Sequence, residues 1–258
     1  MEEPVNREAS VQAAEDRTMD LIFPELKAHL SYLNDVYNLA FHVQTHLDGQ
    51  RIADISHQAR AQYMIRMRAT DFVRCVQLLC IKGYPEQSGT LAASVFELAH
   101  TALFLERDAA KSSEWLNARS IEDQMPKGVL GTNWREVVRL NTNDSGDVTV
   151  AEREYQVYTQ LCWMKHSLPK MQDMRVESDG KIGLIFGPYS DERSINHAWF
   201  SMEHVGRLTE MVMGLLAAKL GDPLLSTALT SFTQTRDSLR QRAIARFGDD
   251  NPFLDATA

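Results

Sequence analysis

Hydrophobic positions recur at helical spacing along most of this chain, and the most apolar stretch covers residues 88–107. The positions that create the pattern are Leu91, Val95, Phe96, Leu98, Leu103, Phe104 and Leu105. Apolar side chains therefore occur on nearly every side of this helix, and a helix of that kind is normally enclosed by other helices. We expect residues 88–107 to form the central helix of an all-α bundle.

Other stretches with apolar residues every three or four positions predict the helices that surround the central one. The long ones cover residues 25–47, 52–82, 149–168, 190–220 and 223–247. Short helices are expected over 112–118 and 133–138, and Asn133 and Glu136 have the spacing of a capping box at the start of the second. The turn at Gly83–Pro85 is short, and short connections favour antiparallel neighbours. The sequence therefore predicts an up-and-down bundle of about six to eight helices.

One stretch departs from the helical pattern. Residues 174–186 alternate between polar and apolar side chains around Asp179-Gly180, which is the strongest short signal for a hairpin turn. We expect a small β-hairpin there. The remaining boundaries follow from polarity: residues 1–20 are expected to be a flexible segment, 21–248 a single helical domain and 249–258 a tail.

Composition and charge narrow the function classes. The chain has 258 residues and a formal net charge of −8, which does not favour nucleic acid as a partner, because phosphate neutralisation supplies most of that affinity. The arginines at 236, 240 and 242 we interpret as a solvated helix face. Three cysteines are too few for a disulfide framework. With no secretory signal and no membrane-length apolar run, we expect a soluble cytoplasmic protein without a membrane partner or a cofactor.

The sharpest chemical feature lies inside the central helix. Glu97 and His100 are three residues apart and so share one face. Ionisable groups in a core must find partners or shift their pKa. We expect Glu97 to meet Tyr158 or His166 of the helix over 149–168, or Arg68 of the preceding helix. Such a cluster would hold the bundle together or line a ligand pocket, with Arg68, Glu97 and His166 as candidate ligand contacts and Glu97, His100, Tyr158 and His166 as candidate catalytic groups.

Two histidine patterns bear on metal binding. The Glu97-x-x-His100 spacing is half of a ferritin-like two-metal site, but among the eight histidines only His100 follows a glutamate at that distance. His42 and His46 are one helical turn apart and could chelate one ion, although such pairs are common by chance. We expect no metal site, and keep a metal-binding helical bundle as a second alternative.

An Arg-x5-His pair provides a different alternative. Arg51 and His57 are similar to the motif of the helical HEPN ribonucleases, in which both residues contact the scissile phosphate. Chance produces such pairs readily in a chain with eight histidines, and Ile52 replaces the polar residue that those enzymes favour. A HEPN-like ribonuclease toxin or phage-defence hydrolase is therefore the alternative function.

The order of features from Arg68 to Pro188 resembles a widespread, uncharacterised family of helical bacterial proteins, a domain of unknown function. The matching positions are Arg68, Gly83, Leu91, Ser94, Glu97, Tyr158, His166, Gly187 and Pro188. Ala93 stands where that family has an arginine one turn before the glutamate, so this chain lacks half of an Arg–Glu pair at that place. The resemblance implies a helical bundle and no particular activity.

Taken together, these patterns predict a non-enzymatic module that binds a protein or a small ligand through or around a buried Glu/His/Tyr cluster. An exposed helix face would also allow a homo-oligomer, such as a homodimer.

Overall fold

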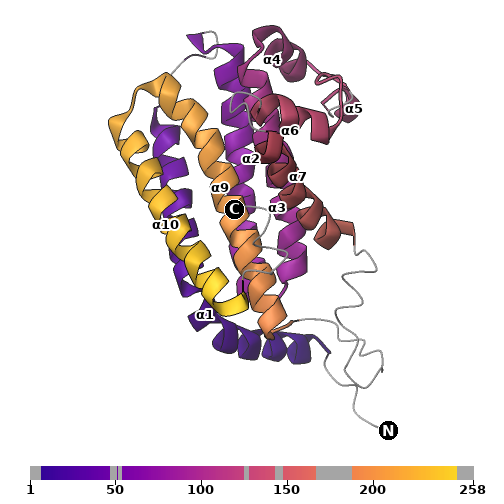
Figure 1. Cartoon of the computed structure of the whole chain (residues 1–258), viewed down its shortest axis with the longest axis vertical. Coiled ribbons are helices and arrows are strands. Elements are labelled where there is room, and N and C mark those ends of the chain that lie inside the picture. The colour runs from indigo at the N-terminus through magenta and orange to yellow at the C-terminus, as the bar shows by residue number, and fades with distance from the viewer. Residues whose placement is uncertain are drawn as a thin grey trace.

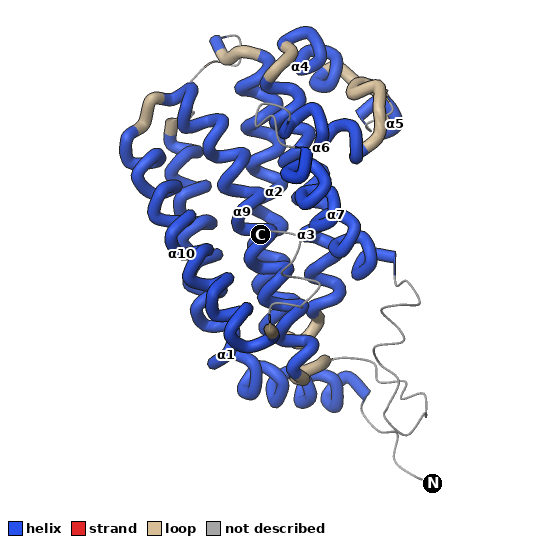
Figure 2. Tube along the Cα trace, viewed as in Figure 1, coloured by secondary structure: helices blue, strands red, loops and turns tan. Residues whose placement is uncertain are grey.

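The computed structural model describes residues 7–46, 51, 54–124, 128–142, 148–166 and 188–248. Every regular element in these residues is a helix, and no strand occurs in them (Figure 2). The predicted all-α class is confirmed. The β-hairpin expected at 174–186 and the tail at 249–258 lie outside the described residues.

The long helices run side by side along the long axis of the molecule, and the short ones gather at one end (Figure 1). In chain order the helices are α1 Arg7–Thr45, α2 His57–Ile81, α3 Pro85–Glu106, α4 Ala109–Leu116, α5 Ile121–Gln124, α6 Trp134–Thr142, α7 Val148–His166, α9 Glu192–Leu220 and α10 Pro223–Phe247.

Helix α1 begins at Arg7, well inside the segment that we expected to be flexible. The early part of that segment is rich in glutamate and alanine, which are good helix formers. It is also tied to the bundle, because the Lys82 ammonium lies 3.5 Å from Glu15 and 3.3 Å from Asp16. Pro24 lies inside the helix, where it removes a backbone hydrogen bond and favours a kink. Figure 1 shows the start of α1 crossing one end of the bundle before the helix turns along α10.

Two helices form the centre of the bundle. Helix α3 packs against α2, α6, α7 and α9, as expected for residues 88–107, and α9 packs against α1, α2, α3 and α10. Phe96 and Leu105 of α3 and Val205 and Leu208 of α9 are fully buried. Within the described residues one helix, α3, is long and apolar enough to cross a membrane, but 61% of its apolar window is buried by its neighbours.

The helix starts follow the capping chemistry of the sequence. The Asp191 carboxylate accepts a hydrogen bond from the Ser194 amide at 2.7 Å and starts α9. Asn133 accepts one from the Glu136 amide at 3.1 Å at the start of α6. The Glu136 side chain binds Arg139 instead of closing the capping box. Asn133 therefore caps α6, but the Glu136 side chain does not accept the reciprocal hydrogen bond from the Asn133 amide.

A close approach between α1 and α9 depends on Gly206. A Cβ atom at this position would lie 2.6 Å from the hydroxyl oxygen of Tyr32, and closer still to its ring. Tyr32 is almost fully buried, and its hydroxyl donates to the Glu210 carboxylate one turn further along α9. The missing side chain at Gly206 is therefore what lets the hydroxyl end of the Tyr32 ring approach α9 closely.

We predict that Gly206→Ala lowers the free energy of unfolding by about 1–3 kcal/mol, because the added methyl group overpacks the Tyr32 ring. Gly214→Ala is the matched control on the same helix, since a Cβ there meets no atom within 4 Å. The control should gain up to about 1 kcal/mol from better helix propensity. Urea denaturation of both variants checks the pair, and equal effects would contradict the proposed contact.

Candidate functional site

Glu97 and His100 face different partners. The Glu97 carboxylate accepts a hydrogen bond from the Tyr158 hydroxyl at 2.8 Å and lies 3.4 Å from the Lys165 ammonium. Burial, with the Glu97 charge beside it, raises the pKa of Tyr158 well above its ordinary value. Glu97 itself keeps 23% of its side chain exposed, so it lies at the edge of the core. The side chain of His166 lies outside the described residues.

Arg68 does not join this cluster. Its side chain is exposed on α2 with the guanidinium 4.5 Å from the centre of the Phe72 ring. No hydrogen bond or ion pair links it to Glu97 in the described part of the chain. Ala93 is fully buried and has no charge that could pair with Glu97.

His100 belongs to a buried network that joins four helices. Its Nε2 lies 3.2 Å from the Glu154 carboxylate of α7, and the same oxygen accepts from Arg207 of α9 at 2.8 Å. The Asn141 amide of α6 donates to the His100 carbonyl at 2.8 Å and lies 3.3 Å from Nδ1. Because Nδ1 faces a donor, the ring proton belongs on Nε2, directed at Glu154.

The charges of this network are balanced. Burial alone would raise the pKa of Glu154, but Arg207 and the hydrogen bond from His100 outweigh it and hold the pKa well below its ordinary value. The carboxylate therefore stays ionised and Arg207 stays paired. Two polar atoms of the network, Oδ1 of Asn141 and Nε of Arg207, are buried without a hydrogen-bond partner. The bonds that are made join four helices, and a buried polar network of this kind specifies how helices pack.

A second polar group lies further along α9. Glu210 accepts from Tyr32 of α1 and lies 3.4 Å from Arg236 of α10. Glu203, two turns earlier, is buried beside arginines of α9 and α10. Burial raises the pKa of Glu203 to about 7, and the nearby positive charges of Arg240, Arg207 and Arg236 offset only part of that shift. Arg236 and Arg240 of α10 therefore interact with buried carboxylates and are not only part of a solvated face.

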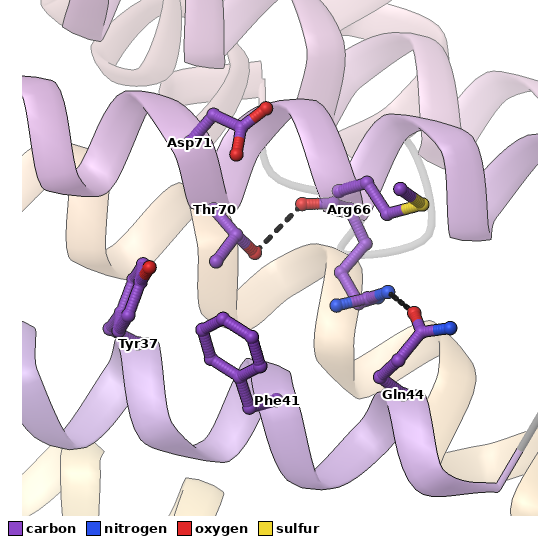
Figure 3. Close-up of a pocket in the computed structure, with 7 residues that line it drawn as sticks. Tyr37, Phe41, Gln44, Arg66, Thr70 and Asp71 are labelled. Carbon is purple, nitrogen blue, oxygen red and sulfur yellow. Dashed lines mark hydrogen bonds between the residues drawn. The ribbon is translucent and has the colours of Figure 1, made fainter. Parts of the chain in front are cut away.

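A hollow of about 190 Å³ lies between α1 and α2 (Figure 3). Figure 3 shows Tyr37, Phe41 and Gln44 of α1 facing Arg66 and Thr70 of α2, with Asp71 at the far end. The Tyr37 and Phe41 rings meet edge to face, with centroids 4.9 Å apart. Phe41 and Met67 of the lining are 56% and 54% exposed. The hollow thus combines an apolar wall with one cation.

Arg66 is the unusual member of this lining. It is only 3% exposed, and its guanidinium donates to the Ala40 carbonyl at 2.7 Å and to the Gln44 amide oxygen. Its Nε has no hydrogen-bond partner. No carboxylate lies within ion-pair distance of it among the described residues. A buried cation with only neutral acceptors is uncommon, because buried charges are normally paired.

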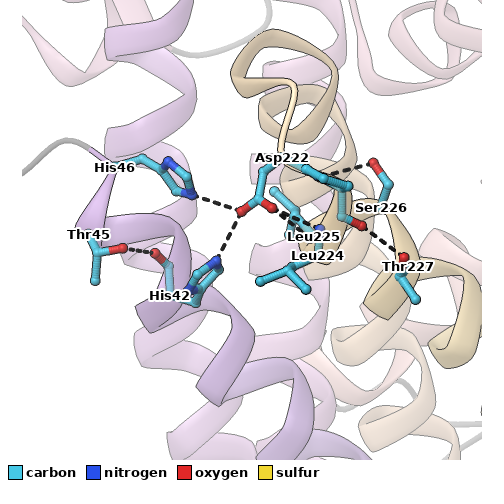
Figure 4. Close-up of polar contacts among 9 residues, drawn as sticks. His42, Thr45, His46, Asp222, Leu224, Leu225, Ser226 and Thr227 are labelled. Carbon is cyan, nitrogen blue, oxygen red and sulfur yellow. Dashed lines mark hydrogen bonds and ion pairs between the residues drawn. The ribbon is translucent and has the colours of Figure 1, made fainter.

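A third cluster forms where α1 ends and α10 begins (Figure 4). His42 and His46 direct Nε2 at the same oxygen of Asp222, at 2.9 and 2.8 Å. The other oxygen accepts from the amides of Leu224 and Leu225 and caps α10. The histidine hydrogen bonds hold the pKa of Asp222 at about 2, so it is a carboxylate throughout the physiological range.

Arg51 and His57, the ribonuclease candidates, are both exposed. The Arg51 guanidinium pairs with Asp54, with Nε 3.0 Å from the carboxylate oxygen. Within the described residues no hydrogen bond or ion pair joins Arg51 to His57. The idea of a phosphate site at these positions stays a prediction.

Sequence reasoning missed Arg66, Glu154 and Asp222. Arg66 gave one usable signal, since it lies on the buried stripe of α2 beside Ile65 and Ala69. Glu154 gave none, and Asp222 gave only its local role as the N-cap of α10, because their other partners are on helices distant in the chain.

Comparison with known proteins finds no matching family model, no matching curated protein and no matching solved structure. The resemblance drawn from residues 68–188 stays a prediction.

We predict that Glu154→Gln destabilises the fold far more than Glu97→Gln. Removing the Glu154 charge leaves Arg207 without its counter-charge and should lower the free energy of unfolding by about 3 kcal/mol. This is the lower end of the range for a buried pair, because both side chains keep some solvent contact. Glu97 is partly exposed, and its loss should cost about 1 kcal/mol. Chemical denaturation compares the two. An equal cost would show that the Arg207 pair does not stabilise the core.

The raised pKa of Glu203 predicts a pH-dependent stability. Between pH 4.5 and about 7 the folded state holds a proton that the unfolded state has released. The contribution of this group is therefore fully present below pH 4.5 and is lost as the pH rises through 7. Relative to the wild type, the free energy of unfolding of Glu203→Gln should rise by roughly 3 kcal/mol between pH 4 and pH 8.

Thermal or urea unfolding across that range measures the effect. Glu122→Gln, at an exposed position, is the control and should track the wild type at each pH. A difference between Glu203→Gln and wild type that is independent of pH would mean that Glu203 is ionised in the folded state.

Proposed function

We propose that this protein is a non-catalytic binding module whose α1–α2 hollow takes a small organic anion with an apolar body. The observation that carries the proposal is Arg66, a buried guanidinium at the hollow without a carboxylate partner in the described residues. An anionic group on a ligand would supply that missing charge.

The charge on Arg66 supports an anionic ligand. Arginine stays protonated in proteins, even though burial lowers the pKa of this one. Its neutral partners, the Ala40 carbonyl and Gln44, lie near the end of α1, where the helix dipole offers about half a negative charge at most. The remaining positive charge favours a carboxylate or a similar anion, which a guanidinium can bind through two parallel hydrogen bonds.

The wall of the hollow favours a ligand with an apolar body. Tyr37 and Phe41 present aromatic surface, and Met67 adds a flexible side chain that adapts to a ligand's shape. Phe41 and Met67 are more than half exposed, and exposed apolar side chains around a hollow are typical of a binding site.

The size and the far end of the hollow limit the ligand. Sites for drug-sized molecules are roughly 300–1,000 Å³, so a hollow of about 190 Å³ favours a smaller molecule. Asp71 at the far end would repel a second negative charge and accept a hydrogen bond. A monocarboxylate with an aliphatic or aromatic body therefore fits better than a dicarboxylate.

We predict that octanoate or phenylacetate binds to the wild type at one site per chain, and that octan-1-ol or 2-phenylethanol binds at least tenfold more weakly. A tenfold loss corresponds to about 1.4 kcal/mol and follows from the lost ion pair with Arg66. Isothermal titration or ligand-observed NMR measures it.

The variants separate charge from apolar contact. Arg66→Gln should lose the preference for acid over alcohol, and the exposed Phe41→Ser should weaken both ligands without affecting the fold. Arg74→Gln, an exposed arginine on the same helix that hydrogen-bonds Gln77, should behave as wild type. Failure of both acids to bind, or equal affinity for acid and alcohol in the wild type, would overturn the proposal.

A further inference from the structure

We propose that His42, His46 and Asp222 form a site for one divalent transition-metal ion, of which zinc(II) is the test ion. The site lies where the end of α1 meets the start of α10 (Figure 4). By helical spacing, His42 and His46 are on a different side of α1 from Phe41 and Gln44 of the hollow. It does not depend on the proposed anion ligand.

The spacing of the donor atoms fits a metal ion. The two Nε2 atoms and the Asp222 oxygen all lie within 4.8 Å of one another. The nitrogens are 2.9 and 2.8 Å from that oxygen. Ligands about 2.0–2.1 Å from a tetrahedral ion are about 3.3 Å apart. Small side-chain rotations that lengthen the two N···O distances by a few tenths of an ångström would therefore bring them to the spacing of metal ligands.

The chemistry of the donors selects the class of ion. Two imidazole nitrogens with one carboxylate suit zinc, copper, nickel or cobalt, whereas magnesium and calcium prefer oxygen ligands alone. Asp222 is already a carboxylate, so the ion displaces no proton from it. Each neutral imidazole can bind through Nε2 while its ring proton moves to Nδ1.

The surroundings hold the carboxylate in place. The second oxygen of Asp222 is fixed by the Leu224 and Leu225 amides, and the side chain is only 7% exposed. Support of this kind orients a ligand for its metal. His42 and His46 are 40% and 33% exposed, so a bound ion would be reached from solvent and would complete its coordination with water or another ligand.

A bound ion would join two distant parts of the chain. His42 lies 180 residues before Asp222 in sequence, and no unfolded chain holds these groups together. The ion therefore binds the folded state in preference and stabilises it by mass action.

The first experiment measures binding by metal-free full-length protein. Zinc is titrated in competition with a chromogenic chelator, and cobalt is added separately to follow its visible absorption. We expect one ion per chain, at least tenfold weaker binding in His42→Gln, His46→Gln and Asp222→Asn, and cobalt bands typical of four or five ligands in the wild type only.

Two features make the variants informative. Asparagine is as good an N-cap as aspartate, so Asp222→Asn keeps the start of α10 and removes the anionic ligand. His57→Gln changes an exposed histidine elsewhere and should bind zinc as the wild type does. Zinc should raise the melting temperature of wild type and His57→Gln, and leave that of Asp222→Asn unchanged.

The proposal is overturned if zinc binds the wild type no more tightly than it binds Asp222→Asn or His46→Gln. The same holds if His57→Gln is the variant that loses binding. In either case the three side chains serve only as a hydrogen-bonded link between α1 and α10.

Discussion

The ion pair between Arg207 and Glu154 is the interaction on which the packing of this bundle most depends. Its two charges lie largely out of solvent, beside other buried polar groups of α3, α6 and α9, and each would be costly if the other moved away. His100 adds a hydrogen bond from α3 to the same carboxylate oxygen. The pair therefore admits only those arrangements in which α3, α7 and α9 keep their register, whereas hydrophobic contacts alone tolerate sliding.

The helices could be predicted because their causes are local. Periodic apolar positions, the Asp191 and Asp222 caps and the turn at Gly83 act over a few residues, and the structure has helices where they indicate. The start of α1 was not foreseen, because what holds it in place is contact with Lys82, which lies in a different part of the chain. Polar composition alone did not distinguish a tethered helix from a loose one.

The candidate site was predicted less completely, for a related reason. Tyr158 was one of three partners expected for Glu97, and their contact is present. His100 was expected to share that cluster, yet its partner is Glu154, which lies on the same helix as Tyr158 and one helical turn before it. Asp222 had an evident local role as an N-cap. Only the fold reveals that the carboxylate oxygen not used in the cap lies beside two histidines. Side-chain pairing between helices depends on their rotation about their own axes, which periodicity does not specify.

The last turns of α1 carry both proposed sites on different sides of the helix. Phe41 and Gln44 line the hollow against α2, while His42 and His46 face Asp222. An ion that fixed the two histidines would also limit how far the neighbouring Phe41 can shift. Any resulting change in anion affinity would be matched by an equal change in ion affinity, because coupling between two sites is reciprocal. Through this stretch of helix, the occupancy of either site would then change the affinity of the other.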